Sequence, residues 1–132
     1  FQTSQHQDFV VVRYADVLLM AAELGSSKAQ LYFDKVRSRA GLTTKEPSQE
    51  NIMKERFVEF AFEGQRYWDL LRQGIDVASS TIAESGIELK SGGNPDVITI
   101  TADKIKTTKG FCQIPSTQIT LSDNVLKQNA GW

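Results

Sequence analysis

Two acidic side chains, Glu59 and Glu63, stand one helical turn apart in the sequence. Two carboxylates at this spacing could lie close enough to hydrolyse a glycosidic bond, one as the acid and the other as nucleophile or base. The surrounding segment, from Glu55 to Arg72, is dense in aromatic and arginine side chains. Perturbed acids in such settings often belong to structural ion-pair networks. We therefore predict that neither acid is catalytic and that the protein is not an enzyme.

The sequence gives little support for a metal site or for a catalytic cysteine. His6 is the only histidine, whereas a carboxylate-bridged metal pair in a helical bundle needs Glu-x-x-His motifs on facing helices. Cys112 is the only cysteine, so the chain has no internal disulfide. A cysteine with no histidine nearby in sequence is more often a small buried hydrophobic residue than a nucleophile. We expect no catalytic residue, no metal and no cofactor.

Aromatic rings are the remaining candidates for chemistry, because the planes of Tyr67, Trp68 and Trp132 could stack on sugar rings. Tyr67 and Trp68 lie in the middle of a predicted helix, in an apolar setting that favours a position in the core. Trp132 is terminal, and we expect it to be docked rather than free. The sequence therefore assigns no ligand-binding residue.

Composition sets further bounds. The chain of 132 residues has the length of one domain, and its formal net charge of −1 leaves no basic excess for binding nucleic acid. No apolar run approaches the ~20 residues that span a membrane. Residues 1–8 lack the basic and apolar regions of a signal peptide, and the first residue is not methionine. We expect a processed or truncated piece of a longer protein.

The element that must position the charged side chains is a long predicted helix, which follows an N-cap at Ser48 and stops at Gly74. Apolar residues recur on more than one side of it, so we expect neighbours on several sides. Gly64 interrupts the helix, which indicates a kink or the close approach of another element. A spacing of three residues predicts three ion pairs: Arg56 with Glu59, Glu63 with Arg66, and Asp69 with Arg72.

Two shorter helices precede it. The first runs from Arg13 to Glu23, and the second starts at a capping box formed by Ser27 and Gln30 and ends at Gly41. The helical period predicts their inner faces: Tyr14, Val17, Leu18 and Ala21 in the first, and Ala29, Phe33, Val36 and Ala40 in the second. Two antiparallel helices joined by a short turn resemble one tetratricopeptide-like hairpin.

The second half is predicted to hold shorter elements. Residues 75–84 form a short helix, 85–95 a glycine-rich loop, 97–101 and 110–114 the paired strands of an antiparallel β-hairpin, and 117–121 a helical turn. The tail, residues 122–132, carries Val125, Leu126 and Trp132, so we predict that it packs across the helical layer with Trp132 as its anchor. The fold class is mainly α: a tetratricopeptide-like hairpin and a long helix of the α-α superhelix type, with a small β-hairpin near the C-terminus.

Four motifs, in order along the chain, resemble the SusD/RagB family of outer-membrane nutrient-binding lipoproteins. The most specific is Glu-Arg-x-x-Glu-x-Ala-Phe-Glu-Gly-x-Arg-Tyr-x-Asp-Leu-x-Arg at residues 55–72. The others are Arg-Tyr-Ala-Asp-x-Leu-Leu at 13–19, Val-Arg-x-Arg-Ala-Gly-Leu at 36–42, and a closing segment with Ile-Pro at 114–115 and Gln-Asn-Ala-Gly-Trp at 128–132. Gln118 stands where the family usually has an acid and Ala130 where it has proline, and neither change alters a known catalytic group.

The resemblance implies the C-terminal, helix-rich part of a protein exposed on the cell outer membrane and lipid-anchored through an N-terminal region absent from this chain. The implied role is to bind a glycan or other nutrient and pass it to a TonB-dependent, SusC-like transporter. This part would be scaffold, with most ligand contacts elsewhere. The domain would span 1–132, with 1–8 frayed, helices at 9–74, a short helix and loop at 75–96, and the β-hairpin and docked tail at 97–132.

Ten residues are expected to be structural: Arg13, Tyr14, Arg37, Glu59, Glu63, Gly64, Arg66, Asp69, Arg72 and Trp132. An unpaired buried charge is prohibitive. We therefore predict that Glu63 and the three charges after it pair with neighbours, including Arg13 or Arg37. The alternative function is a stand-alone tetratricopeptide-like module for protein–protein interaction, against which an upstream lipid-attachment cysteine would argue.

Overall fold

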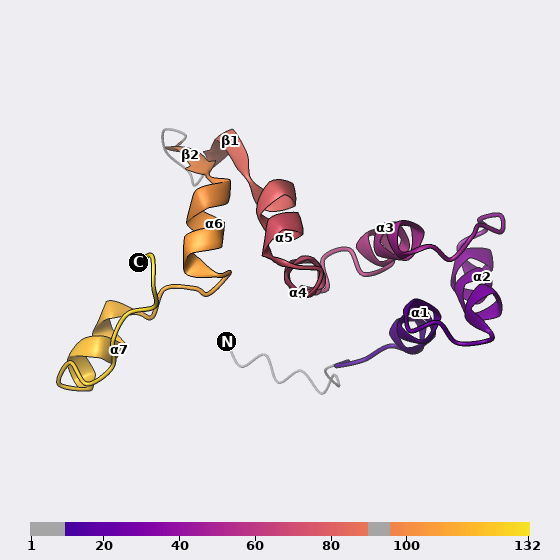
Figure 1. The fold of residues 1–132 in the computed structure, drawn as a ribbon, viewed down its shortest axis with the longest axis horizontal. Helices are drawn as coiled ribbons and strands as arrows, with labels where there is room; N and C mark the ends of the chain where they lie inside the picture. Colours follow the sequence, from indigo (N-terminus) through magenta and orange to yellow (C-terminus); the bar gives the residue numbers. More distant parts are fainter. Residues whose placement is uncertain (1–9, 90–95) are drawn as a thin grey trace, which may run out of the picture. The chain divides into compact units, whose positions relative to one another are not determined.

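The computed structural model describes residues 10–89 and 96–132 (Figure 1). In chain order the elements are α1 (Tyr14–Glu23), α2 (Ala29–Arg39), α3 (Gln49–Glu59), α4 (Arg66–Arg72), α5 (Ile75–Ile82), β1 (Glu84–Leu89), β2 (Asp96–Ile100), α6 (Ala102–Thr108) and α7 (Ser116–Leu121). This mainly helical class with a small antiparallel sheet confirms the expectation. The chain divides into two compact units, residues 1–66 and 67–132. The expected fraying of residues 1–8 lies outside the described residues.

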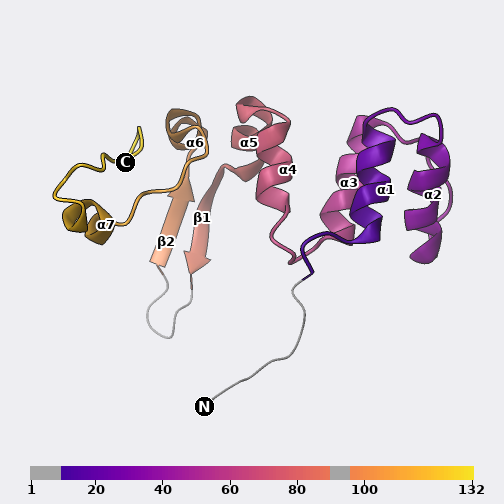
Figure 2. The ribbon, with the colours of Figure 1, turned by 90° about the horizontal axis from the view of Figure 1, so that it is seen from below.

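In the first unit, α1 packs against both α2 and α3 (Figure 2). Their shared core consists of Leu18, Leu19, Ala22, Phe33, Val36, Ile52, Met53 and Phe60. The inner face of α2 was predicted correctly at Phe33 and Val36. The face of α1 was misassigned at Tyr14 and Val17, which are exposed, because α1 has to bury residues toward two neighbours and so turns Leu19 and Ala22 inward.

Two helix ends follow the predicted signals. α2 ends with the Schellman pattern, in which the Leu42 amide donates to the Arg37 carbonyl at 2.9 Å after Gly41. α3 begins at the N-cap Ser48, whose hydroxyl accepts from the Asn51 amide at 3.3 Å. These signals act within a few residues of the helix end, which is why the local sequence predicts them.

The predicted capping box at Ser27 is wrong. α2 begins one residue later than that cap predicts, at Ala29, with Lys28 as an N-cap that makes no side-chain capping bond. The side chain of Gln30 donates instead to Asp34 at 2.9 Å and to the carbonyl of Lys45 at 2.9 Å. Contacts with the following loop therefore take the glutamine that the capping box would have used.

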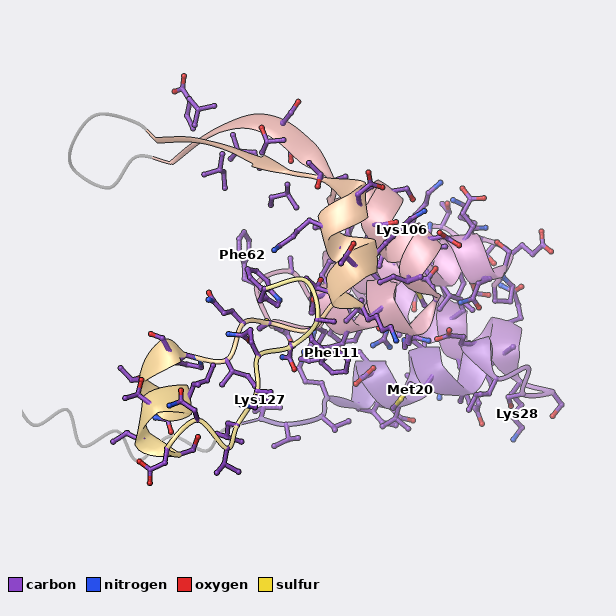
Figure 3. All side chains as sticks on the ribbon, turned by 60° about the vertical axis from the view of Figure 1, so that its left-hand side comes forward. Met20, Lys28, Phe62, Lys106, Phe111 and Lys127 are labelled. Atoms are coloured by element: carbon purple, nitrogen blue, oxygen red, sulfur yellow. The ribbon has the colours of Figure 1, made fainter. Side chains whose placement is uncertain are left out.

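The predicted continuous helix over 48–74 is also wrong, since it breaks into α3 and α4. Phe62 and Gly64 adopt left-handed φ angles of 65° and 75° in the turn between them. A Cβ at Gly64 would meet nothing within 4 Å. The glycine thus serves the turn rather than close packing, which decides between the two roles predicted for it. The Phe62 side chain is fully exposed (Figure 3).

In the second unit, β1 and β2 form an antiparallel hairpin with Glu84 opposite Ile100 and Glu88 opposite Val97. The register shifts between Ser85 and Ile87, where Gly86 has a φ of 74° and forms a bulge. The strand at 97–101 was predicted nearly correctly, but its predicted partner at 110–114 is wrong. Residues 85–89, predicted as loop, supply the partner instead.

α6 explains why the predicted hairpin does not form. The Thr101 hydroxyl accepts from the Lys104 amide at 3.1 Å and starts a helix directly after β2. The lysine-rich stretch read as a strand connection is therefore helical, and α6 packs against α5. α7 confirms the predicted helical turn at 117–121.

Candidate functional site

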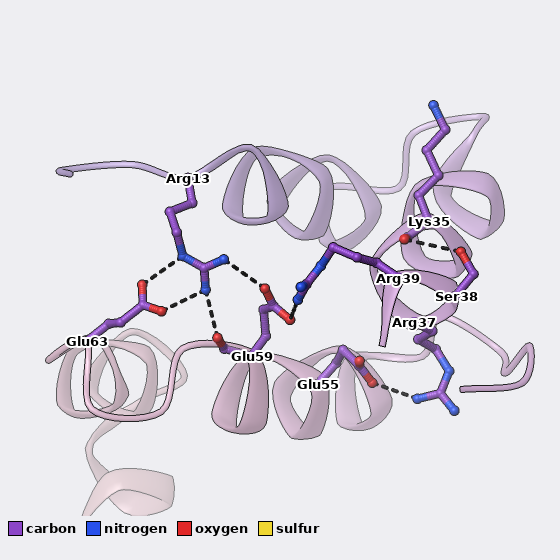
Figure 4. A network of polar contacts seen from close by, with 8 residues as sticks. All are labelled: Arg13, Lys35, Arg37, Ser38, Arg39, Glu55, Glu59 and Glu63. Atoms are coloured by element: carbon purple, nitrogen blue, oxygen red, sulfur yellow. Dashed lines mark hydrogen bonds and ion pairs between the residues drawn. The ribbon is translucent and has the colours of Figure 1, made fainter. Parts of the chain in front are cut away.

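Arg13, the N-cap residue of α1, binds two acidic residues of the first unit (Figure 4). Its guanidinium donates to both carboxylate oxygens of Glu63, from Nε at 2.9 Å and from Nη2 at 2.7 Å. It also donates from Nη1 to Glu59 Oε1 at 2.8 Å and from Nη2 to the Glu59 carbonyl at 2.7 Å. The hydrogen bonds that Arg13 donates to Glu63, and then those to Glu59, raise the pKa of Arg13 above its ordinary value.

Glu59 joins all three helices. Its second carboxylate oxygen, Oε2, accepts from Arg39 Nη2 of α2 at 2.5 Å. The Glu59 side chain is only 6% exposed, so two cations compensate a largely buried carboxylate. The pair Glu59 and Glu63, considered above for glycoside hydrolysis, thus has the geometry of ion pairs with arginine.

Two more pairs flank this network. Arg37 of α2 donates to Glu55 Oε2 at 2.6 Å and to the Thr43 carbonyl at 2.8 Å. Arg56 Nη1 of α3 donates to Asp16 Oδ1 of α1 at 2.5 Å, and both side chains are nearly inaccessible to solvent. Sequence spacing gave no signal for these partners, because 18 and 40 residues separate them.

Phe60, the C-cap of α3, lies between two guanidinium groups. The centre of its ring is 4.8 Å from Arg13 and 5.0 Å from Arg56. Arg56 also donates to Gln65 at 3.1 Å. Arg13, through Glu63, and Arg56, through Gln65, therefore both bind the turn that separates α3 from α4.

The predicted pairs along residues 55–72 have mixed outcomes. Arg72 Nε donates to Asp69 at 3.0 Å, as predicted. Arg66 was expected to pair with Glu63, but Glu63 binds Arg13, and the Arg66 guanidinium lies 4.6 Å from the ring centre of Phe57. Arg56 was expected to pair with Glu59 and binds Asp16 instead, so both predictions are wrong.

A pocket of about 470 Å³ opens between α1 and α2. Its lining consists of Arg13, Tyr14, Ala15, Leu18, Lys35, Val36 and Arg39. Within the described ranges, no group of three or more His, Cys, Asp or Glu side chains could hold a metal ion. Over the same ranges, none of the helices has the length and apolar character required to cross a bilayer. His6 lies outside the described residues.

The remaining chemical candidates lie in the second unit. The Tyr67 hydroxyl donates to the Gly110 carbonyl, and burial raises the Tyr67 pKa. Trp68 makes an edge contact with Tyr67 at 5.4 Å but is 66% exposed, so its predicted core position is wrong. Cys112 is exposed too, contrary to the interpretation as a buried residue.

Trp132 contacts a smaller surface than the tail prediction requires. Its indole Nε1 donates to the Phe111 carbonyl at 2.9 Å, and the Lys104 ammonium lies 4.1 Å from the ring centre. Val125 and Leu126, predicted to pack as well, are exposed. The tail contacts α6 rather than crossing a helical layer, since Gly131 sits against Thr107 and Thr108.

Comparison with known proteins identifies the family of this chain. The sequence profile of the SusD family matches residues 2–132. SusD-like protein P2 of Formosa agariphila is 25% identical over 146 residues, covering 95% of this chain and 26% of that protein. Surface glycan-binding protein A of Bacteroides thetaiotaomicron is 34% identical in two solved structures. One, with a TM-score of 0.65, covers 90% of this chain and 24% of that one.

The other structure is a complex with laminarihexaose, with a TM-score of 0.67 and coverage of 92% of this chain and 24% of that one. The chain therefore spans about a quarter of the length of these relatives. The motifs at 13–19, 36–42 and 55–72 hold Arg13, Arg37, Arg39 and Glu59, which join the three helices of the first unit. This chain belongs to the SusD family.

Proposed function

We propose that this chain is the helical scaffold of a cell-surface protein that captures oligosaccharide and passes it to a TonB-dependent, SusC-like transporter in the outer membrane, where a lipid anchor holds it. The observation that carries the proposal is the likeness to a surface glycan-binding protein, which includes its complex with laminarihexaose. No enzymatic role is proposed, because Glu59 and Glu63 are engaged by arginines.

The scaffold role is supported by where the charges of the family motifs lie. Arg13, Arg37 and Arg39 each bind a carboxylate of α3, from α1 or α2. Ion pairs between packed helices fix their relative positions, and the largely buried Glu59 carboxylate is bound by an arginine at the start of α1 and by another in α2. A rigid three-helix unit is what a surface protein needs to present binding segments in a fixed arrangement.

Calorimetric titration of the full-length protein that contains this chain with laminarihexaose tests the glycan-binding part, with a second glucose hexasaccharide of different linkage as the comparison. We expect measurable heat with at least one of the two. Co-purification with an affinity-tagged SusC-like transporter from outer membranes tests the delivery part. A chain that binds no oligosaccharide but retains protein partners would instead support a stand-alone tetratricopeptide-like interaction module.

A further inference from the structure

α1 has a second apolar face besides the one that packs against α2 and α3. Tyr14, Val17, Ala21 and Leu24 follow one another at spacings of three, four and three residues, so they lie along one side of the helix. We call these four residues the outer seam. Tyr14 and Val17 are exposed, Ala21 is partly exposed, and Leu24, the C-cap, is 87% exposed. The residues that α1 gives to the core are different ones.

The charged side chains of α1 do not lie on the outer seam. Asp16 accepts from Arg56, and Glu23 accepts from Gln49 at 2.8 Å, so both acids of α1 bind side chains of α3. Met20 borders the seam with another exposed apolar side chain. A helix that is apolar on every side is either buried in protein or crosses a membrane. α1 has 10 residues, far fewer than the ~20 of a membrane span, which leaves burial in protein.

We propose that an α-helix from the part of the full-length protein outside residues 1–132 packs along the outer seam. This chain spans about a quarter of the length of its relatives. A segment of the same polypeptide meets the seam at a high effective concentration, so it needs no large interface to bind. Paired helices of the tetratricopeptide type bury their outer faces against neighbouring units in the same way.

The pocket between α1 and α2 adjoins the outer seam, because Tyr14 belongs to both. Ala15, Leu18 and Val36 form the apolar part of the pocket lining, and they belong to the core or pack against it. Packed helices place side chains of one helix into grooves of the other. The pocket therefore offers a groove for a side chain of the helix that covers the seam.

A second copy of this chain fits the outer seam less well. A stable interface takes about 20–30 residues from each partner, whereas the exposed residues on and beside the seam are Tyr14, Val17, Met20 and Leu24. Helices that pair as coiled-coil dimers carry charges at the positions flanking their seam. The flanking positions inside α1 hold Leu18 and Met20, and apolar residues there are typical of a helix inside a core.

The rate of thiol labelling tests whether the seam is covered in the full-length protein, with its free cysteines, Cys112 included, replaced by serine. Val17→Cys should react with a maleimide at least about tenfold more slowly than Lys28→Cys, because a covered thiol reacts only when the structure opens locally. Lys28 is the matched control, since it is exposed and lies outside α1. The two thiols should react equally in denaturant, and circular dichroism checks that each variant is folded.

Photo-crosslinking identifies what covers the seam. With p-benzoylphenylalanine in place of Tyr14, which keeps an aromatic ring at that position, we expect a crosslink within one polypeptide to a peptide outside residues 1–132. Mass spectrometry of the digested product locates that peptide. A crosslink to a second copy or to the transporter would overturn the proposed occupant, and so would the absence of any crosslink.

Equal labelling of the two cysteines in the folded full-length protein would overturn the inference as well. Protection of Val17→Cys that disappears on dilution would assign the seam to a second copy, and protection that requires added transporter would assign it to that partner. Each of these results leaves the proposed glycan capture standing, because titration with oligosaccharide tests that function separately.

Discussion

At the scale of single residues, Glu59 shows how a buried acid is accommodated. One carboxylate oxygen binds Arg13, the other binds Arg39, and the residue's own carbonyl takes a further bond from Arg13. Burying a carboxylate is costly unless it is paired and hydrogen-bonded on all sides. Glu59 meets that requirement with cations from two other helices.

The buried pair of Asp16 and Arg56 should carry far more stability than an exposed one. Asp16→Asn keeps the size of the side chain but takes the carboxylate from Arg56, which is 5% exposed. We expect a loss of about 3 kcal/mol in the free energy of unfolding, measured by urea denaturation. Glu50→Gln removes the acid of the exposed pair with Lys54 and should cost far less, because solvent screens that pair. Equal losses for the two variants would contradict this assignment.

Arg66 should contribute less to the stability of the fold than its position among the charged motif residues indicates. Its guanidinium lies over Phe57, whose side chain is 56% exposed. Arg66→Ala should therefore cost roughly 0.5–1 kcal/mol, the value of an exposed cation–π contact, instead of the several kcal/mol of a buried ion pair. Thermal melts of Arg66→Ala and Phe57→Leu should shift by similar small amounts. A loss as large as that of Asp16→Asn would show that Arg66 has a buried role.

The sequence predicts which residues form ion pairs, but it predicts the partner only when the two residues are close in sequence. Asp69 and Arg72 lie three residues apart on one helix, so spacing alone identifies the pair. Arg13 and Glu63 are 50 residues apart, and only the packing of α1 against α3 brings them together. A local periodicity contains no information about such distant pairs, and arginine offers donors to whichever carboxylate the fold presents.

At the scale of elements, the break between α3 and α4 was present in the sequence but was misread. The apolar residues of the segment fall on more than one side, a pattern that predicts one helix packed on several sides. Two shorter helices with different faces produce the same pattern. Likewise, the alternation of apolar and polar residues predicts β2. Its partner β1 contains a glycine bulge, and the sequence of that stretch resembles a loop.

The turn between the helices should respond in opposite ways to two substitutions. Gly64→Ala forces a Cβ into the left-handed region at a φ of 75° and should cost about 1–2 kcal/mol, although the space around it is open. Phe62→Asn, at a φ of 65°, places a residue that tolerates this conformation and should be neutral or stabilising by under about 1 kcal/mol. Chemical denaturation of both variants tests this. Equal destabilisation would mean that packing, not backbone conformation, governs the turn.

The contact between α5 and α6 should weaken in acid. Lys106 binds Asp76 at 2.8 Å and holds the Asp76 pKa below its usual 3.8. Because the folded pKa is the lower one, the contribution is present above about pH 4 and disappears as the pH falls through the folded pKa. Asp76→Asn should lower the melting temperature slightly at pH 7 and have no effect near pH 2. A difference from the wild type that persists in strong acid would contradict the pairing.

At the scale of the whole molecule, the family motifs mark connections between elements inside each unit. In the first unit they join α1, α2 and α3 through arginine and glutamate. In the second, the Gln128 side chain bonds both the amide and the carbonyl of Ile114, at 2.8 and 2.9 Å, and Trp132 bonds Phe111. Motifs of this kind identify an architecture, which is why they predicted the family and the fold class but left the ligand unassigned.

The last prediction concerns the tail, which makes specific hydrogen bonds although about half of its Trp132 side chain is exposed. Deleting residues 124–132 removes the Gln128 bonds, the Trp132 indole bond and the packing of Gly131 against Thr107 and Thr108. Trp132 keeps 49% of its surface exposed, so roughly 1–2 kcal/mol of apolar burial is lost, and the melting temperature should fall by several degrees. Val125→Ser, at a side chain that is 79% exposed, should change nothing. If the truncated chain melts like the intact one and binds no more apolar dye, the tail contributes no stability to its own unit.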